Sequence, residues 1–461
     1  MRWLATGFAC LLAATASAAV PTAAIDRYIV AEMARQRIPG LALAVLQHGR
    51  PLYVHGYGVA SLEWPNRVEA DTRFQIGSIG KQFTAVAVML LVRDGRLELD
   101  APLAHYLPEV PASWSGVTLR RMLAHQSGIA QLDGDDRRLL DLRHEYSDEE
   151  YVRLAASQPL EFEPGTDADY SDTAYVLLGV VIGRVTGRFY GELLAERVFA
   201  PLGMERTQVI SDEDIVAKRA SGYELDAAGR LRNQSFVSAA LNRTADGSLY
   251  STVHDLARWD AALYGARVLP RDVLDRMWRV DPLAGGEPPL YHYGYGWEIN
   301  HLRAQTVIEY DGNWQGFQAA MARYPGRELS VIVLTNRSLC RAQAIAHSVA
   351  GYVDAALRPV EAASRDANPQ ATERLRALLE AARAGDEDAR PAALTARRWR
   401  ALGRDLRAVG DLARLEFAGE TVRSDGVERR YRAELTSMVE IYTLRQAADG
   451  SIRSLDVERE H

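Results

Sequence analysis

Ser78 and Lys81 are the residues whose types and spacing point most directly to chemistry. They stand three positions apart in Phe74–Ala85, where Gly77 permits a sharp turn and apolar residues then recur at helical spacing. Residues three apart on a helix share one face, so we expect the Lys81 amine beside the Ser78 hydroxyl. Because a serine hydroxyl becomes a good nucleophile only when a neighbouring group takes its proton, the pair predicts an activated nucleophile at a helix N-terminus.

Ser-x-x-Lys alone is a weak signal, because the same spacing arises often by chance. Tyr170 is a possible third partner, since it precedes the apolar helical run 176–187 and its hydroxyl could face a cleft. The same residue would equally fit a buried tyrosine whose hydroxyl is satisfied. His125 could be catalytic, but we favour a structural histidine that fixes a loop near the site.

The elements that must position these residues form a hairpin, a helical middle and a set of strands. The expected strands are 40–47, 52–60, 295–299, 306–310, 317–323 and 329–335, with 311–316 as a turn; the expected helices are 25–37, 118–124, 176–187 and 253–263. This order predicts an α/β (α+β) fold. An antiparallel sheet made from both ends of the domain is flanked by helices, with a helical subdomain inserted between its halves.

The composition is that of an ordinary globular protein. The 461 residues are 48% hydrophobic and 25% charged, with a formal net charge of -7. This balance gives no indication of nucleic-acid binding. The histidines are scattered and do not pair with cysteines, so we expect neither a metal site nor a cofactor. The length predicts two or three domains.

The N-terminus resembles a secretory signal. Residues 1–18 combine a positive start, an apolar run too short to span a bilayer and the small residues Ala16 to Ala18 as a cleavage site. We expect a periplasmic or secreted protein without a transmembrane span after cleavage. Cys10 as a lipoprotein attachment site is the alternative. Loss of this segment leaves Cys340 alone, which excludes an intrachain disulfide.

The composition changes after residue 356. Residues 357–370 predict a polar linker, and residues 371–461 predict two helices followed by strands, a small α+β domain. This domain carries no chemistry of its own, so we interpret it as a packing or binding accessory.

Several further segments along the chain carry short motifs in addition to Ser78 and Lys81. They are Leu123–Gly128, Tyr170–Asp172, Tyr175–Gly179, Pro201–Met204, Ser251–Leu256, Gly312–Phe317 and Val333–Asn336. With Ile76–Thr84, they resemble the serine β-lactamase and penicillin-binding-protein superfamily, in its class C β-lactamase-like branch. That branch also holds D-aminopeptidases, D,D-carboxypeptidases and esterases. The resemblance covers roughly residues 25–356 and implies a β-lactamase/transpeptidase-like fold.

The resemblance also implies roles for individual residues. Ser78 would be the acylated nucleophile, Lys81 would shuttle or stabilise its proton, and Tyr170 would be the general base for attack and the acid for the leaving group. The oxyanion hole would be the backbone N–H groups of Ser78 and Asn313, the residue after Gly312.

Two substrate-binding positions depart from the family pattern. Asp172 stands where the second motif usually has asparagine, and a carboxylate accepts hydrogen bonds but cannot donate them. Tyr310 stands where the third motif, with Gly312, usually opens on lysine or histidine, so a cationic partner for a substrate carboxylate is lost. Both changes weigh against an efficient β-lactamase.

The sequence therefore predicts an exported serine hydrolase acting through an acyl-enzyme on Ser78. Its substrate would be an ester, a D-amino-acid amide or peptide, or a β-lactam-like molecule, either a small molecule or a fragment of peptidoglycan. The alternative is a catalytically weak homologue that binds peptidoglycan fragments or a protein partner.

Overall fold

The computed structural model describes residues 20–459, apart from 133–138, 212, 287, 290, 303–304, 359–362, 364, 367, 425 and 437–438. The predicted signal peptide, residues 1–18, lies outside this part of the chain. Among the described residues, no helix is both long and apolar enough to cross a bilayer.

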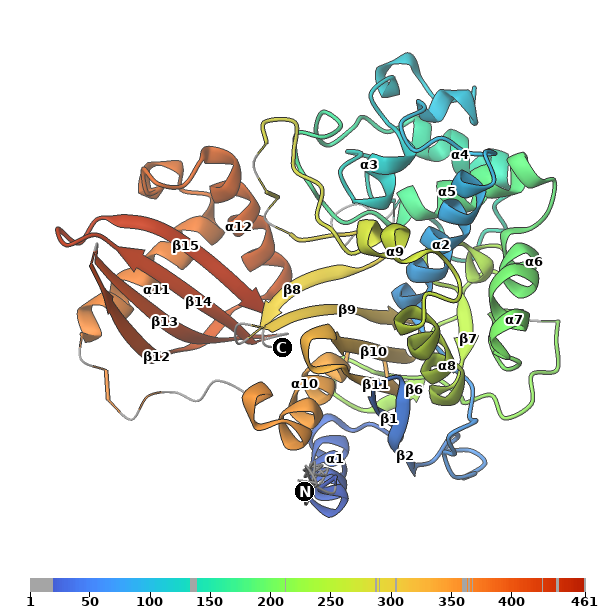
Figure 1. Ribbon diagram of the computed structural model, residues 1–461, viewed down its shortest axis with the longest axis horizontal. Coiled ribbons are helices and arrows are strands. Elements are labelled where there is room, and N and C mark those ends of the chain that lie inside the picture. The colour runs from blue at the N-terminus through green and yellow to red at the C-terminus, as the bar shows by residue number, and fades with distance from the viewer. Residues whose placement is uncertain are drawn as a thin grey trace, which may run out of the picture.

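A six-stranded antiparallel sheet is the centre of the molecule (Figure 1). Its strands run in the order β2, β1, β11, β10, β9, β8. They span β2 Arg50–Gly58, β1 Gly40–Gln47, β11 Leu329–Thr335, β10 Phe317–Tyr324, β9 Gln305–Trp314 and β8 Glu298–Leu302. The hairpin near the start of the chain pairs with the last strand of this sheet, Leu41 opposite Thr335. The antiparallel sheet expected from both ends of the domain is confirmed.

Both faces of the sheet are covered by helices. Helices α1 (Thr22–Gln36) and α10 (Ala342–Val353) pack on one face, and α2 (Gly80–Arg93) and α8 (Val253–Tyr264) lie on the other. Alternate residues of β11 pack into two hydrophobic cores on opposite faces of the sheet. Val333 lies on the α10 side and Ile332 on the α2 side. This explains why the central strands are continuously apolar.

The expected helical subdomain lies between β2 and β8. It holds α3 Leu119–Leu123, α4 Asp148–Ala156, α5 Asp172–Thr186, α6 Tyr190–Leu194, α7 Ala200–Leu202 and α9 Arg271–Met277, with the small strands β3 Phe74–Gln75, β4 Gln208–Val209, β5 Tyr223–Leu225, β6 Leu231–Asn233 and β7 Leu249–Ser251. The starts of α3, α5 and α8 are capped by the side chains of Thr118, Ser171 and Thr252. These caps fix where each helix begins.

Several sequence-based boundaries were wrong. The helix expected over 176–187 begins at Asp172, directly after its cap Ser171. The strand expected over 295–299 begins only at Glu298. The segment 311–316, expected as a turn, lies mostly in β9, because Asp311 to Trp314 pair with Phe317 to Ala320 of β10. Polar and glycine residues suggested a loop here, but pairing with the apolar neighbouring strand decides the structure.

The C-terminal residues form a separate core. Helices α11 (Pro369–Ala384) and α12 (Ala396–Val409) pack on an antiparallel sheet of β12 Leu412–Arg423, β13 Gly426–Leu435, β14 Val439–Gln446 and β15 Ile452–Arg459. Figure 1 shows this unit beside the β8 edge of the main sheet, and β15 lies close to β8.

Arg323 and Asp260 form an ion pair within the core, between β10 and α8. The Arg323 Nε donates to Asp260 Oδ1 over 2.7 Å, and Ser330 Oγ donates to the same oxygen over 2.9 Å. Both ion-pair side chains are almost completely buried. The rings of Tyr264, Trp278 and Trp297 lie against the guanidinium and stabilise its charge.

We predict that Asp260→Ala lowers the free energy of unfolding by about 3–5 kcal/mol, because it leaves the Arg323 charge buried without its carboxylate. The check is urea denaturation. The control is Asp275→Ala, which breaks the exposed Arg271–Asp275 pair and should cost less than about 1 kcal/mol. Equal losses in the two variants would contradict this explanation.

Candidate active site

Ser78 lies on a 3₁₀ turn, Gly77–Ile79, between β3 and α2. The sequence placed it in the first turn of the helix, and the structure places it just before that turn. Gly77 has φ 51°, which favours glycine. A Cβ on Gly77 would lie 2.8 Å from Asn313 N, and one on Gly247 would lie 2.6 Å from Gly77 C. The turn can therefore approach the neighbouring backbones only because these positions lack side chains.

Ser78 lies within hydrogen-bond distance of both other residues proposed for catalysis, Lys81 and Tyr170. Ser78 Oγ is 2.6 Å from Tyr170 Oη, and Lys81 Nζ donates to Ser78 Oγ over 3.0 Å. The Lys81 ammonium also lies over the Tyr170 ring, 4.8 Å from its centroid. The structure thus brings together a candidate nucleophile from the 3₁₀ turn, a cation from α2 and a phenol from the loop before α5.

Asp172 completes this group from the first turn of α5. It forms an ion pair with Lys81, and its Oδ1 accepts a hydrogen bond from Tyr170 Oη over 2.8 Å. Since the Tyr170 hydrogen goes to Asp172, Ser78 donates to Tyr170. Burial alone would raise the pKa of the Asp172 carboxyl, but the Lys81 charge and the hydrogen bonds it accepts hold that pKa below its ordinary value.

Gln131 and the backbone at Asp246 complete the site, and neither was found from the sequence. Gln131 Nε2 donates to Asp172 Oδ2 over 2.8 Å, while its Oε1 accepts from Asp172 N over 2.7 Å. The Asp246 carbonyl accepts from Lys81 Nζ over 2.6 Å. No sequence pattern marks a lone glutamine, or a carbonyl group, as a partner of residues far along the chain.

Gly312 and Asn313 lie on β9 against the nucleophile turn. A Cβ on Gly312 would be 2.0 Å from Ile76 O and 2.9 Å from Ser78 N. The Asn313 side chain is held by Leu339 N, which donates to its Oδ1 over 2.9 Å. The strand therefore presents the Asn313 backbone beside Ser78, and the use of these two N–H groups as an oxyanion hole stays a prediction.

His125 and Tyr310 form a buried uncharged pair beside Tyr170. Tyr310 Oη is 3.4 Å from His125 Nε2, and His125 Nδ1 accepts from Ser171 N over 3.1 Å. Burial, with the Lys81 charge nearby, lowers the pKa of His125 to about 3. Burial also raises the pKa of Tyr310 well above its ordinary value. The position at which we expect the third motif to open thus holds a neutral tyrosine.

The pKa of the Tyr170 phenol is also raised well above its ordinary value. Burial is the larger cause, and the negative charge of Asp172 is the next. The phenol is therefore protonated in the resting site, and Tyr170 can accept the Ser78 proton only as it passes its own to Asp172.

Comparison with known proteins decides the family. The family model described as Beta-lactamase matches residues 25–350. The chain belongs to the beta-lactamase family. Among curated relatives, it is 28% identical over 316 residues to Penicillin-binding protein 4* of Bacillus subtilis, covering 66% of this chain and 69% of that one. It is 28% identical to a D-aminopeptidase of Gluconobacter oxydans, covering 68% and 59%.

Solved structures show the same fold. The octameric penicillin-binding protein homologue from Pyrococcus abyssi matches with TM-score 0.63 and 24% identity, covering 95% of this chain and 98% of that one. A D-stereospecific amidohydrolase from Streptomyces matches with TM-score 0.60 and 25% identity, covering 71% and 97%. The expected β-lactamase/transpeptidase-like fold is confirmed. The first of these matches extends over the C-terminal unit.

We predict that Tyr170→Phe slows acylation by an activated ester about 10²–10⁴-fold, because it removes the hydroxyl that contacts Ser78. Stopped-flow release of p-nitrophenol measures this rate. Tyr190→Phe is the control, since it loses a buried hydroxyl bonded to Thr244 O that does not touch Ser78. Unchanged acylation in Tyr170→Phe would remove Tyr170 from the mechanism.

We also predict a pH dependence of stability caused by His125. Its folded pKa of about 3 lies below the ordinary value of 6.5, so the unfolded chain binds a proton more readily and stability falls as the pH drops below 6.5. Between pH 7 and pH 5 this costs about 2 kcal/mol.

His125→Asn should remove that part of the pH dependence. Asparagine can accept from Ser171 N and tolerates the positive φ of 55° at this position. Urea denaturation of both proteins at pH 7 and pH 5 makes the comparison. The same slope in both would contradict a neutral His125.

Proposed function

We propose that this protein is an exported serine hydrolase that forms an acyl-enzyme on Ser78, with esters or D-amino-acid amides and peptides as substrates. The observation that carries this proposal is the position of Ser78 Oγ, which lies 3.0 Å from Lys81 Nζ and 2.6 Å from Tyr170 Oη. Export is supported by residues 1–18, which have the pattern of a signal peptide.

In the acylation step, Ser78 Oγ attacks the substrate carbonyl carbon and its proton passes to Tyr170 Oη, while the Tyr170 proton passes to Asp172. The Lys81 ammonium stabilises the negative charge that develops on Ser78 Oγ. The backbone N–H groups of Ser78 and Asn313 hold the carbonyl oxygen. Collapse of the tetrahedral intermediate breaks the bond to the leaving group, which takes the proton back through Tyr170.

In the deacylation step, water takes the place of the leaving group. Tyr170 accepts a proton from the attacking water through the same relay and returns it to Ser78 Oγ as the ester bond breaks. No other group is consumed, so the cycle ends with Ser78, Tyr170 and Asp172 in their starting protonation states.

The preference for esters and D-amino-acid derivatives over β-lactams rests on charge. β-Lactams and peptidoglycan stems present a carboxylate, and Tyr310 offers it no positive partner, since its raised pKa keeps it neutral. Asp172 presents a carboxylate where a substrate amide would seek a donor. Two of the relatives, a D-aminopeptidase and a D-stereospecific amidohydrolase, have names that agree with this choice, while two others are named as a penicillin-binding protein and a penicillin-binding protein homologue.

A catalytically weak binding protein is the second candidate, and a specific observation favours it. Asp172 has a lowered pKa and is held by Lys81, Tyr170 and Gln131, so it is a weak acceptor for the relayed proton. Such a site would acylate slowly and retain its ligand.

The test is intact-mass spectrometry after incubation with penicillin, p-nitrophenyl acetate or D-alanine p-nitroanilide, with Ser78→Ala as the control. We expect turnover of the ester or the anilide, and an adduct that Ser78→Ala abolishes. Labelling that survives this substitution would remove Ser78 as the nucleophile. The absence of adduct and turnover with every reagent would favour the binding protein.

The same experiment with Asp172→Asn examines substrate choice. We expect Asp172→Asn to slow acylation by every reagent, because an amide cannot take up the proton that Tyr170 passes on. The loss should be at least about tenfold smaller for penicillin than for p-nitrophenyl acetate, because one hydrogen bond gained to penicillin in the transition state is worth about 1.4 kcal/mol. Equal losses with the two reagents would show that Asp172 does not set this preference.

A further inference from the structure

Helix α12 of the C-terminal unit contacts the loop that carries Tyr170. Arg404 Nη2 is 3.4 Å from Asp167 Oδ2, and Arg404 Nε is 3.5 Å from Asp169 Oδ2. Asp169 directly precedes Tyr170 in the chain. One guanidinium of the C-terminal unit thus joins two carboxylates at the base of the catalytic loop.

The Asp169 carboxylate connects Arg404 to the backbone of Tyr170. Its Oδ1 accepts from Tyr170 N over 3.0 Å, while its Oδ2 faces Arg404. On the other side of the loop, Asp169 N donates to His125 O over 2.9 Å. A change in the orientation of the Asp169 side chain would therefore move the backbone N–H of Tyr170, and with it the phenol that contacts Ser78.

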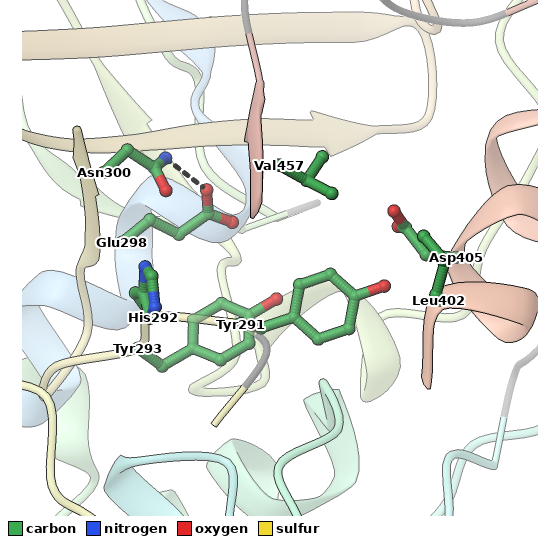
Figure 2. Close-up of a pocket in the computed structure, with 8 residues that line it drawn as sticks. All are labelled: Tyr291, His292, Tyr293, Glu298, Asn300, Leu402, Asp405 and Val457. Atoms are coloured by element: carbon green, nitrogen blue, oxygen red, sulfur yellow. Dashed lines mark hydrogen bonds between the residues drawn. The ribbon is translucent and has the colours of Figure 1, made fainter. Parts of the chain in front are cut away.

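Helix α12 also lines a cavity together with a neighbour of the Tyr170 ring. Leu402 and Asp405 of α12 face Tyr291 and Tyr293 across a cavity of about 40 Å³ (Figure 2). The Tyr293 ring lies 4.6 Å from the His125 ring and 6.3 Å from the Tyr170 ring, centroid to centroid. Helix α12 thus contacts the loop that carries Tyr170 directly, and it faces Tyr293, a neighbour of the Tyr170 ring, across this cavity.

Arg404 supplies a positive charge among the carboxylates at the base of the loop. Burial raises the pKa of the Asp169 carboxyl, the Arg404 charge opposes this, and the charges of Asp167 and Asp405 add to it. Without Arg404, these carboxylates would repel one another at the base of the loop, and Asp169 would lose the partner that orients it.

We propose that Arg404 is a positioning residue that holds Tyr170 in line with Ser78, so that the C-terminal unit controls acylation. This inference rests on the proposed function of Ser78. A displacement of about 1 Å of a reacting group can cost up to 10²-fold in rate, and a partly exposed ion pair contributes up to about 1 kcal/mol. Loss of both Arg404 contacts, with Asp167 and with Asp169, is therefore expected to lower kcat by about three- to thirtyfold.

The test measures kcat and KM for p-nitrophenyl acetate in the full-length wild type, Arg404→Ala and Arg404→Lys. We expect kcat to fall by about three- to thirtyfold in Arg404→Ala with KM within about twofold, and Arg404→Lys to recover part of the loss. The control is Arg400→Ala on the same helix, whose ion pair with Glu387 stays within the C-terminal unit. Its kcat should match the wild type.

Asp169→Asn examines the same contact from the loop. Because Arg404 acts through Asp169, the losses in Arg404→Ala and Asp169→Asn should not add in the double variant. Thermal unfolding followed by circular dichroism shows whether each variant is folded at the assay temperature. If Arg404→Ala is not folded at that temperature, it is replaced by Arg404→Gln, which keeps most of the side chain.

The outcomes separate the two proposals. If the wild type forms the Ser78 adduct and Arg404→Ala keeps its kcat, the role of Arg404 is wrong and the proposed function stands. Equal losses in Arg404→Ala and Arg400→Ala, or fully additive losses with Asp169→Asn, also overturn it. If the wild type forms no adduct and shows no turnover, the proposed function fails, and this inference fails with it.

Discussion

The site depends on the burial of one positive charge. Lys81 lies in the apolar helix α2 with no exposed surface, and a buried ammonium is tolerated only when it is compensated by partners. Asp172 supplies the opposite charge, and the Asp246 carbonyl and Ser78 Oγ take the other two N–H groups. Gln131 and Tyr170 then satisfy Asp172. The catalytic geometry follows from satisfying this one cation.

The same constraint explains why the site is built from distant segments. The partners of Lys81 come from α5 and from the backbone before β7, and the turn that carries Ser78 is packed between Gly247 and β9. Three glycines allow these backbones to approach. Side chains at Gly77, Gly247 or Gly312 would separate the nucleophile from the strand beside it. Close backbone approach and charge compensation thus act on the same few residues.

Much of the fold and part of the site could be predicted from the sequence. The strands β1 and β11 are nearly continuous apolar runs, and the helices α2 and α8 have apolar residues at helical spacing. Local patterns therefore suffice to place them. The segment Asp311–Trp314 could not be placed, because its pairing with β10 overrides its local preference for a turn. Ser78 and Lys81 stand close in sequence and could be paired. The contacts of Gln131 and Arg404 join residues far apart in the chain, and no spacing encodes them.

The pairing of β1 with β11 has a consequence for how the chain acquires its fold. Leu41 can pair with Thr335 only after the residues between them have been synthesised. The helices formed by those residues pack on sheet faces that are complete only once β1 and β11 have paired. Such non-local pairing makes folding slow, because a long loop must close before its contacts form. The emerging chain therefore cannot complete its main sheet until β11 has been synthesised.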